Sequence, residues 1–309
     1  MKRLLLLSLF ASLTFLYVGC DSSDDETVTP PVAQDKIVNT WISEGAGVAP
    51  GLVTLLKTVK ITATFNSNNT YTVIAKDSAG AEVTYSGTYS VSENTGTTIR
   101  SITLNQSAPT SVTSQGIYEV DAKGMMTYEV IQTTPAINGF TPPVASEGFG
   151  STKYLGTPLG ATYVQGFVPA NPTSELLVDS WISEGLNVAP GLVLTLKTKK
   201  VVATFNANNT YTVVATDSFN TDVTYSGTYT TTGNTGTSTR NITLNQTVPT
   251  SVTSTGIYRV TTKDLTYEVI QTTPAIPGFT APTAAEGFGS TKYNGTPLGA
   301  TWVQKFIYQ

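Results

Sequence analysis

The chain has no histidine and a single cysteine in 309 residues. Histidine is the commonest general base and metal ligand of proteins, so its absence removes every Ser–His or Cys–His catalytic pair. One cysteine allows neither an intrachain disulfide nor a thiolate metal site. We therefore expect a protein that is not an enzyme and that has no catalytic residues, no metal and no dissociable cofactor.

Charged side chains are also scarce. They make up 12% of the residues, against about 25% in an average soluble protein, and the formal net charge is −4. This balance provides no basic surface for nucleic acid. The chain is instead rich in Thr, Ser, Asn, Gly and Tyr, a composition typical of β-sheet proteins outside the cell.

The N-terminal residues have the pattern of a secretory signal. Lys2 and Arg3 precede an apolar run, residues 4–17, that is too short for a stable membrane span. The run ends in YVGC, which resembles a bacterial lipobox. That resemblance implies cleavage of a lipoprotein signal peptide, residues 1–19, and a covalent lipid on Cys20. The alternative is a cysteine that stands by chance at the end of an ordinary signal.

An acidic segment follows Cys20. The sequence DSSDDE is followed by Pro30 and Pro31, and such a segment cannot bury a core. We expect a disordered tether over residues 20–36. It resembles the acidic export tag of surface lipoproteins in Bacteroidetes-type bacteria, although a solvated spacer is equally consistent. Both interpretations predict a lipid-anchored protein of the outer membrane or cell surface, whose lipid contacts the membrane.

Most of the remaining chain consists of two copies of one sequence repeat. NTWISEGAGVAPGL, which begins at Asn39, returns as DSWISEGLNVAPGL at Asp179, and VTYSGTY and TYEVIQTTPAI recur unchanged. Each unit is long enough for a domain with its own core. We predict two domains, residues 37–168 and residues 177–309, joined by a Pro-containing linker over residues 169–176.

Within each unit the apolar residues alternate with a period of two, which predicts β-strands. About eight antiparallel strands are expected, with a turn at Asn68-Asn69 and with the run ATYVQGF closing on NTWISEG. Pro50 could open a short helix through Lys57 or the same run could begin a strand. The lone Trp in the first strand, the NNTYT hairpin and the central GTY strand resemble bacterial lipocalin-like (calycin-type) domains. That resemblance implies an all-β fold of two tandem barrels.

Two other architectures fit the same alternation. A pair of Ig-like β-sandwiches would have a similar number of strands without closure. A membrane-spanning β-barrel is disfavoured because the strands look closer to about seven residues than to the ten or so that a bilayer requires.

Tyrosines lie on one face of the predicted strands, together with valines. They are Tyr71, Tyr85, Tyr89, Tyr118 and Tyr128 in the first unit, and Tyr211, Tyr225, Tyr229, Tyr258 and Tyr267 in the second. If this face points inward, a ring of phenols lines each barrel, and each buried hydroxyl needs a partner. The lipocalin resemblance implies a small apolar ligand inside, whereas a packed core is the alternative.

A long loop rich in Gly and Pro, residues 135–160, recurs in the second unit. Its aromatic residues are Phe140, Phe149 and Tyr154 in the first copy and Phe279, Phe288 and Tyr293 in the second. We expect this loop to cap one barrel mouth or to contact a partner.

Acidic residues give no catalytic pair, because Glu44 and Glu184 lie one in each unit. Arg100 and Arg240 suit surface ion pairs as well as anion binding. The sequence thus favours non-catalytic binding of a small hydrophobic or amphipathic ligand. The rival hypothesis is a surface adhesion or interaction protein with solid barrels and a glycan or protein partner, whose loops, such as residues 79–82, differ between the copies.

Overall fold

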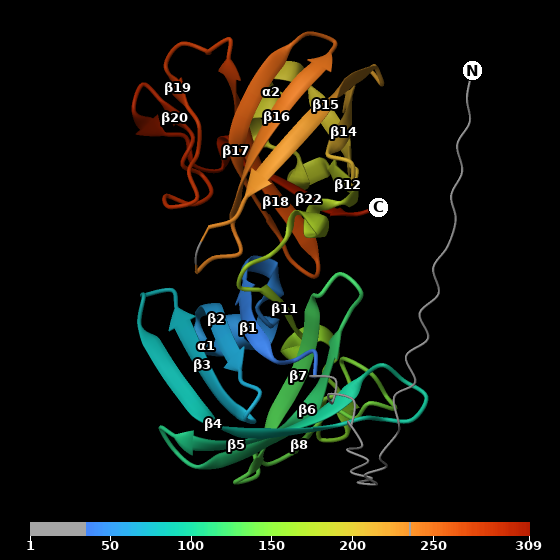
Figure 1. Ribbon diagram of the computed structural model, residues 1–309, viewed down its shortest axis with the longest axis vertical. Helices are drawn as coiled ribbons and strands as arrows, with labels where there is room; N and C mark the ends of the chain where they lie inside the picture. The colour runs from blue at the N-terminus through green and yellow to red at the C-terminus, as the bar shows by residue number, and fades with distance from the viewer. Residues whose placement is uncertain (1–34, 235) are drawn as a thin grey trace, which may run out of the picture. The chain divides into compact units, whose positions relative to one another are not determined.

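The computed structural model describes residues 35–234 and 236–309, and these form an all-β protein of two tandem closed barrels (Figure 1). The predicted signal, Cys20 and most of the predicted tether lie outside the described residues. Closure of both sheets excludes the Ig-like sandwich. None of the described helices is long and apolar enough to cross a membrane.

Eight antiparallel strands close the first barrel in the order β1-β11-β7-β6-β5-β4-β3-β2, and β2 pairs with β1. Their bounds are β1 Asn39–Glu44, β2 Thr58–Phe65, β3 Thr70–Asp77, β4 Glu82–Ser92, β5 Arg100–Ala108, β6 Val112–Val120, β7 Met126–Thr134 and β11 Gln165–Pro169. The predicted return of the last run to the first strand is confirmed, because Trp41 lies opposite Pro169.

The second barrel repeats this arrangement in the order β12-β13-β14-β15-β16-β17-β18-β22, and β22 pairs with β12. The bounds are β12 Asp179–Glu184, β13 Thr198–Phe205, β14 Thr210–Asp217, β15 Asp222–Thr232, β16 Arg240–Val248, β17 Val252–Val260, β18 Asp264–Thr273 and β22 Gln304–Tyr308. The two copies of the repeat therefore form the same closed sheet.

One short helix follows the first strand of each barrel: α1 Pro50–Leu56 and α2 Pro190–Leu196. Proline suits the first turn of a helix because its missing N–H would have no intrahelical partner there. The helical alternative for this run is therefore correct. The chain turns out of α1 through Lys57, whose φ of 55° is left-handed.

The long loop of each repeat forms a small three-stranded sheet outside the barrel (Figure 1). The strands are β8 Phe140–Thr141, β9 Lys153–Tyr154 and β10 Thr157–Pro158, with β19 Phe279–Thr280, β20 Lys292–Tyr293 and β21 Thr296–Pro297 in the second copy. Short 3-10 turns then lead into the closing strands: η2 Gly160–Tyr163 before β11 and η5 Gly299–Trp302 before β22.

One end of each barrel is filled by a large tryptophan. Trp41 and Trp181 are almost completely buried, and their indole N–H groups donate to the carbonyl oxygens of Ile37, at 2.7 Å, and Leu177, at 2.9 Å. Burial of an indole costs little hydrogen-bonding free energy when its N–H has such a partner. These tryptophans therefore anchor the two core clusters of the fold.

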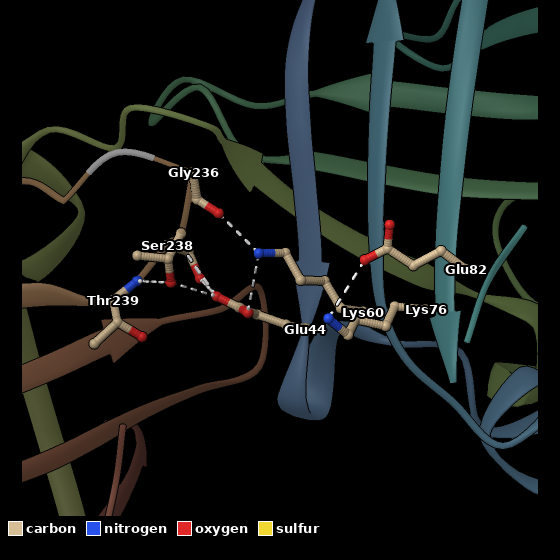
Figure 2. Close-up of polar contacts among 8 residues, drawn as sticks. Glu44, Lys60, Lys76, Glu82, Gly236, Ser238 and Thr239 are labelled. Atoms are coloured by element: carbon tan, nitrogen blue, oxygen red, sulfur yellow. Dashed lines mark hydrogen bonds and ion pairs between the residues drawn. The ribbon is translucent and has the colours of Figure 1, made fainter. Parts of the chain in front are cut away.

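A polar contact joins the barrels at the end of β1 (Figure 2). Glu44 Oε1 accepts a hydrogen bond from the backbone amide of Ser238 at 3.1 Å, and the Ser238 hydroxyl donates to the same oxygen. Lys60 Nζ lies 4.0 Å from the Glu44 carboxylate and donates to the Gly236 carbonyl oxygen at 2.8 Å. The equivalent carboxylate of the second barrel, Glu184, is exposed.

A second contact between the barrels combines charge and burial. Lys123 Nζ lies 2.5 Å from the Asp179 carboxylate, and this hydrogen bond lowers the pKa of Asp179 below its usual value. Met125, from the first barrel, packs into the core cluster of the second. Both barrels and all these contacts lie within residues 35–309, which form one compact unit.

Candidate binding site in the second barrel

The second barrel contains a partly open cavity of about 450 Å³ at the end where α2 lies. Ala189, Leu192 and Leu196 border it from α2 and the residue before that helix, and the turn at Pro249 and Thr250 borders it on another side. We call this space the second-barrel cavity. Its volume lies within the range of small-molecule sites, roughly 300–1,000 Å³.

Both small and aromatic inward side chains line this end of the barrel, with Phe205 and Phe306 among the aromatic ones. Ala203, Val213 and Ala215 supply much of the wall formed by β13 and β14. At the opposite end Trp181 and Tyr229 are completely buried or nearly so and fill the interior. Eight-stranded barrels are just wide enough either to be packed with side chains or to hold a small ligand.

The predicted tyrosines divide into two groups. Tyr211, Tyr225 and Tyr267 line the second-barrel cavity. Tyr229 and Tyr258 lie deeper in the packed end, where the Tyr229 hydroxyl donates to the Asn206 carbonyl at 2.9 Å and the Tyr258 hydroxyl accepts from Arg240 at 2.9 Å. The inward face therefore carries both structural and cavity-lining phenols.

In the first barrel the equivalent tyrosines mostly belong to the core. Tyr71, Tyr89 and Tyr118 are buried, Tyr128 packs against them, and Tyr85 is partly exposed. The Tyr89 hydroxyl donates to the Asn66 carbonyl at 2.8 Å, and that of Tyr118 donates to the Asp35 carboxylate at 2.8 Å.

The second-barrel cavity is uncharged. Burial raises the pKa of Tyr267, with a smaller contribution from neighbouring Tyr211, and burial also raises the pKa of Tyr211. These phenols are therefore neutral at physiological pH. None of the described residues that line the cavity is Asp, Glu, Lys or Arg. An ionised ligand group would have no opposite charge to pair with there.

Two residues that were not predicted from the sequence also line the cavity. Trp302 and Gln304 enter from η5 and β22, and within the described chain Trp302 Nε1 and Gln304 Nε2 are buried without a hydrogen-bond partner. Gln304 begins β22 and alternates with Phe306 on its inward face, whereas Trp302 ends the 3-10 turn before that strand. That alternation was the available signal, although it does not show that the interior is hollow beside them.

Part of the long loop lies on the outer wall of its barrel. Glu268 is completely buried on β18, and its carboxylate accepts hydrogen bonds from the amides of Gly289, at 2.6 Å, and Thr291, at 3.0 Å. Glu129 holds the first copy in the same way, through the amides of Gly150 and Thr152. These carboxylates therefore fasten the loops to the barrels.

The loop aromatics occupy two places. Phe279 packs against Tyr293, with ring centroids 5.1 Å apart, and against Trp302 at 6.2 Å. Phe288 lies beneath the Arg259 guanidinium, 5.3 Å from its ring centroid. In the first copy Phe140 meets Tyr154 at 5.1 Å and Tyr163 at 6.0 Å, and Phe149 is partly buried. Of the second loop, Ile276 reaches the lining of the cavity.

The two arginines considered from the sequence have structural partners. Arg100 lies 3.1 Å from the Asp35 carboxylate, and Arg240 donates to the hydroxyls of Tyr258 and Thr231. Among the described residues no group of three or more Asp, Glu, His or Cys side chains is arranged to hold a metal ion.

Comparison with known proteins adds no family assignment. No protein-family model matches the chain, and no curated protein matches it significantly. Function is therefore inferred from the barrels and from the second-barrel cavity.

Proposed function

We propose that this is a lipid-anchored protein of the cell envelope that binds a small hydrophobic or amphipathic ligand inside its barrels without catalysis. The observation that carries this proposal is the second-barrel cavity, about 450 Å³ and lined mainly by apolar and tyrosine side chains. Transfer of an apolar ligand from water into such a space is favourable in proportion to the apolar area removed from water, roughly 25 cal/mol per Å².

The anchor is proposed from the sequence alone. YVGC at residues 17–20 follows a secretory signal, and the acidic segment after Cys20 would separate the barrels from the membrane surface. A single acyl chain binds membranes only marginally, so stable attachment needs more than one chain or a second signal. We propose a multiply acylated Cys20 at the outer membrane.

Native mass spectrometry of residues 35–309, purified gently from the source cells, tests ligand binding directly. We expect a reproducible added mass that is lost on denaturation. Ala215→Trp should remove it, because Ala215 lines the second-barrel cavity and an indole would fill much of the space. Ala75→Trp, at the equivalent position of the first barrel, is the matched control for overpacking. A clean apo mass, together with no binding of neutral fluorescent dyes, would refute the proposal.

A second candidate function rests on the outer surface. A hollow of about 500 Å³ lies over the outer wall of β5 and β6 and is lined largely by hydroxyl and amide side chains, among them Asn94, Thr103 and Gln115. In the second barrel Phe219 is 79% exposed at a loop where the copies differ. Both features suit a glycan or protein partner. A glycan array probed with residues 35–309 tests this, and Thr103→Val should weaken any glycan binding at the hollow.

A further inference from the structure

We infer that the first barrel is a second, weaker site for the same neutral and largely apolar ligand class, and that residue 61 sets the difference in affinity. This inference rests on the proposed function and extends it to the other barrel. It starts from a comparison of the two interiors, position by position. All but two of the residues that line the second-barrel cavity have an identical counterpart in the first barrel. The exceptions are Val201, which is Ile61 in the first barrel, and Trp302, which is Tyr163.

Inward side chains of the first barrel keep accessible surface at the same positions as those of the second. Val73 and Tyr128 pack against the core cluster of the first barrel, yet each is only partly buried. Their counterparts, Val213 and Tyr267, are also partly buried and line the second-barrel cavity. A side chain that points into a closed barrel is accessible only from the interior or through an open end. The first barrel therefore has interior space beside these residues.

The interior of the first barrel is uncharged, as in the second. None of the counterparts of the cavity-lining residues is Asp, Glu, Lys or Arg. Burial raises the pKa of Tyr128, with a smaller contribution from neighbouring Tyr71, as it raises that of Tyr267. An ionised ligand group would leave water without a counter-charge in either barrel, so both interiors favour a neutral ligand.

The turn beside the opening is also held alike in the two barrels. Gln106 Nε2 donates to the Thr110 carbonyl oxygen at 2.8 Å, and Gln246 Nε2 donates to that of Thr250 at 2.9 Å. Thr250 borders the second-barrel cavity. The first barrel therefore has the same fixed turn at the equivalent edge.

The additional carbon of Ile61 reduces the space inside the first barrel. Ile61 lies opposite Ala75 in the β2–β3 pair, as Val201 lies opposite Ala215 in the β13–β14 pair. Residues directly opposite each other in a sheet point to the same face, so Ile61 projects toward the room that the small Ala75 leaves. Insertion of a methylene into a filled space is unfavourable, and we expect a ligand to bind about tenfold more weakly there.

The second difference between the interiors lies at the opening. Tyr163 ends η2 and Trp302 ends η5, the 3-10 turns that precede the closing strands. Each ring packs against an aromatic residue of the long loop: Tyr163 against Phe140, with ring centroids 6.0 Å apart, and Trp302 against Phe279, at 6.2 Å. Because both rings keep the same neighbour, this exchange affects the opening rather than the space between the strands.

A titration of residues 35–309 with the neutral dye N-phenyl-1-naphthylamine tests the inference. We expect two equivalents of dye per chain, the second bound about tenfold more weakly than the first. Ala215→Trp should remove the tighter equivalent, and Ala75→Trp should remove the weaker one. Native mass spectrometry at increasing dye concentration counts the equivalents independently of fluorescence.

Two conservative exchanges should reverse the difference between the sites. Ile61→Val should tighten the weaker site about tenfold, and Val201→Ile should weaken the tighter site by about the same factor. Both are small changes, so they report on the sites even where a tryptophan variant fails to fold. Val202→Ile adds the same methylene on the outward face of β13 and should leave both affinities unchanged.

The outcomes separate this inference from the proposed function. Binding of one equivalent at every dye concentration would overturn the inference and leave ligand binding in the second barrel standing. Two equivalents that both survive Ala75→Trp, or whose affinities do not respond to Ile61→Val and Val201→Ile, would do the same. Failure of the unaltered chain to bind the dye would overturn both.

Discussion

The buried carboxylate of Glu268 offers the sharpest test of how the long loop is held. It is completely buried, and it accepts hydrogen bonds from the amides of Gly289, at 2.6 Å, and Thr291, at 3.0 Å. Glu268→Gln keeps the size of the side chain but replaces one acceptor oxygen with an NH₂ group. One charge-assisted hydrogen bond is lost, and a buried amide N–H is left facing another donor.

The expected loss follows from these two changes. A hydrogen bond to a charged group contributes about 1.5–3 kcal/mol, and an unsatisfied buried donor costs about 1–3 kcal/mol, with overlap between the two. We therefore expect the loop to open more easily by about 2–4 kcal/mol. Amide hydrogen exchange at Gly289 and Thr291 should accelerate by about thirty- to thousandfold, because each 1.4 kcal/mol is a factor of ten.

Glu129→Gln is the matched variant in the first barrel and should accelerate exchange at Gly150 and Thr152 while leaving the second loop unchanged. Unchanged protection of Gly289 and Thr291 in Glu268→Gln would show that the carboxylate does not hold the loop. Acceleration spread over the strands of the barrel would instead show that the substitution unfolds the domain as a whole.

Three further predictions address the core, the tyrosines and the anchor. Trp181→Phe should lower the free energy of unfolding by about 1–3 kcal/mol in urea, because it leaves the Leu177 carbonyl without the indole donor; an unchanged midpoint would contradict this. Burial raises the pKa of Tyr308 to about 12, with neighbouring Asp179 adding to the shift. Since the unfolded phenol ionises near pH 10, stability should fall as pH rises from about 10 to about 12, and Tyr308→Phe should reduce this fall in pH-dependent urea titrations. Cys20→Ser should abolish metabolic labelling with an alkyne fatty acid and release the protein from the membrane fraction, whereas labelling that persists would show that Cys20 is not the lipid site.

The fold could be predicted from short-range sequence patterns. Alternation puts Tyr211, Val213 and Ala215 on one face of β14, and the structure directs that face inward. The turn at Asn69, with φ 62°, is fixed by a residue type that tolerates a left-handed backbone. These features depend on neighbouring residues, so they could be predicted without knowledge of the whole fold.

The outer-wall contact of the loop depends on distant residues and could not be predicted in the same way. In TYEVIQ the alternation assigns Glu129 to the outer face, where a carboxylate would ordinarily meet water. The structure covers it with Gly150 and Thr152. A clue was present, since Ile117 and Ile131 share that outer face and are buried as well. An outward face with two isoleucines needs a cover, but alternation alone does not identify which segment supplies it.

The size of the cavity also could not be predicted from the alternation of residues. Ala203 and Ala215 are compatible with a packed barrel if a larger neighbour fills the space beside them. Only the three-dimensional packing shows that Trp181 and Tyr229 leave space beside these alanines.

The hydrogen bonds of Glu44 place an evolutionary constraint on the first repeat that the second repeat does not have. Glu44 is bound to Ser238 of the other barrel, whereas its counterpart Glu184 is exposed. Two positions that descend from one ancestral residue thus differ in how well they tolerate substitution. Substitution of residue 184 breaks none of these bonds, whereas substitution of Glu44 removes one of the polar contacts between the barrels. After gene duplication and packing of the two barrels against each other, one copy can in this way acquire a new surface while the other maintains the interface.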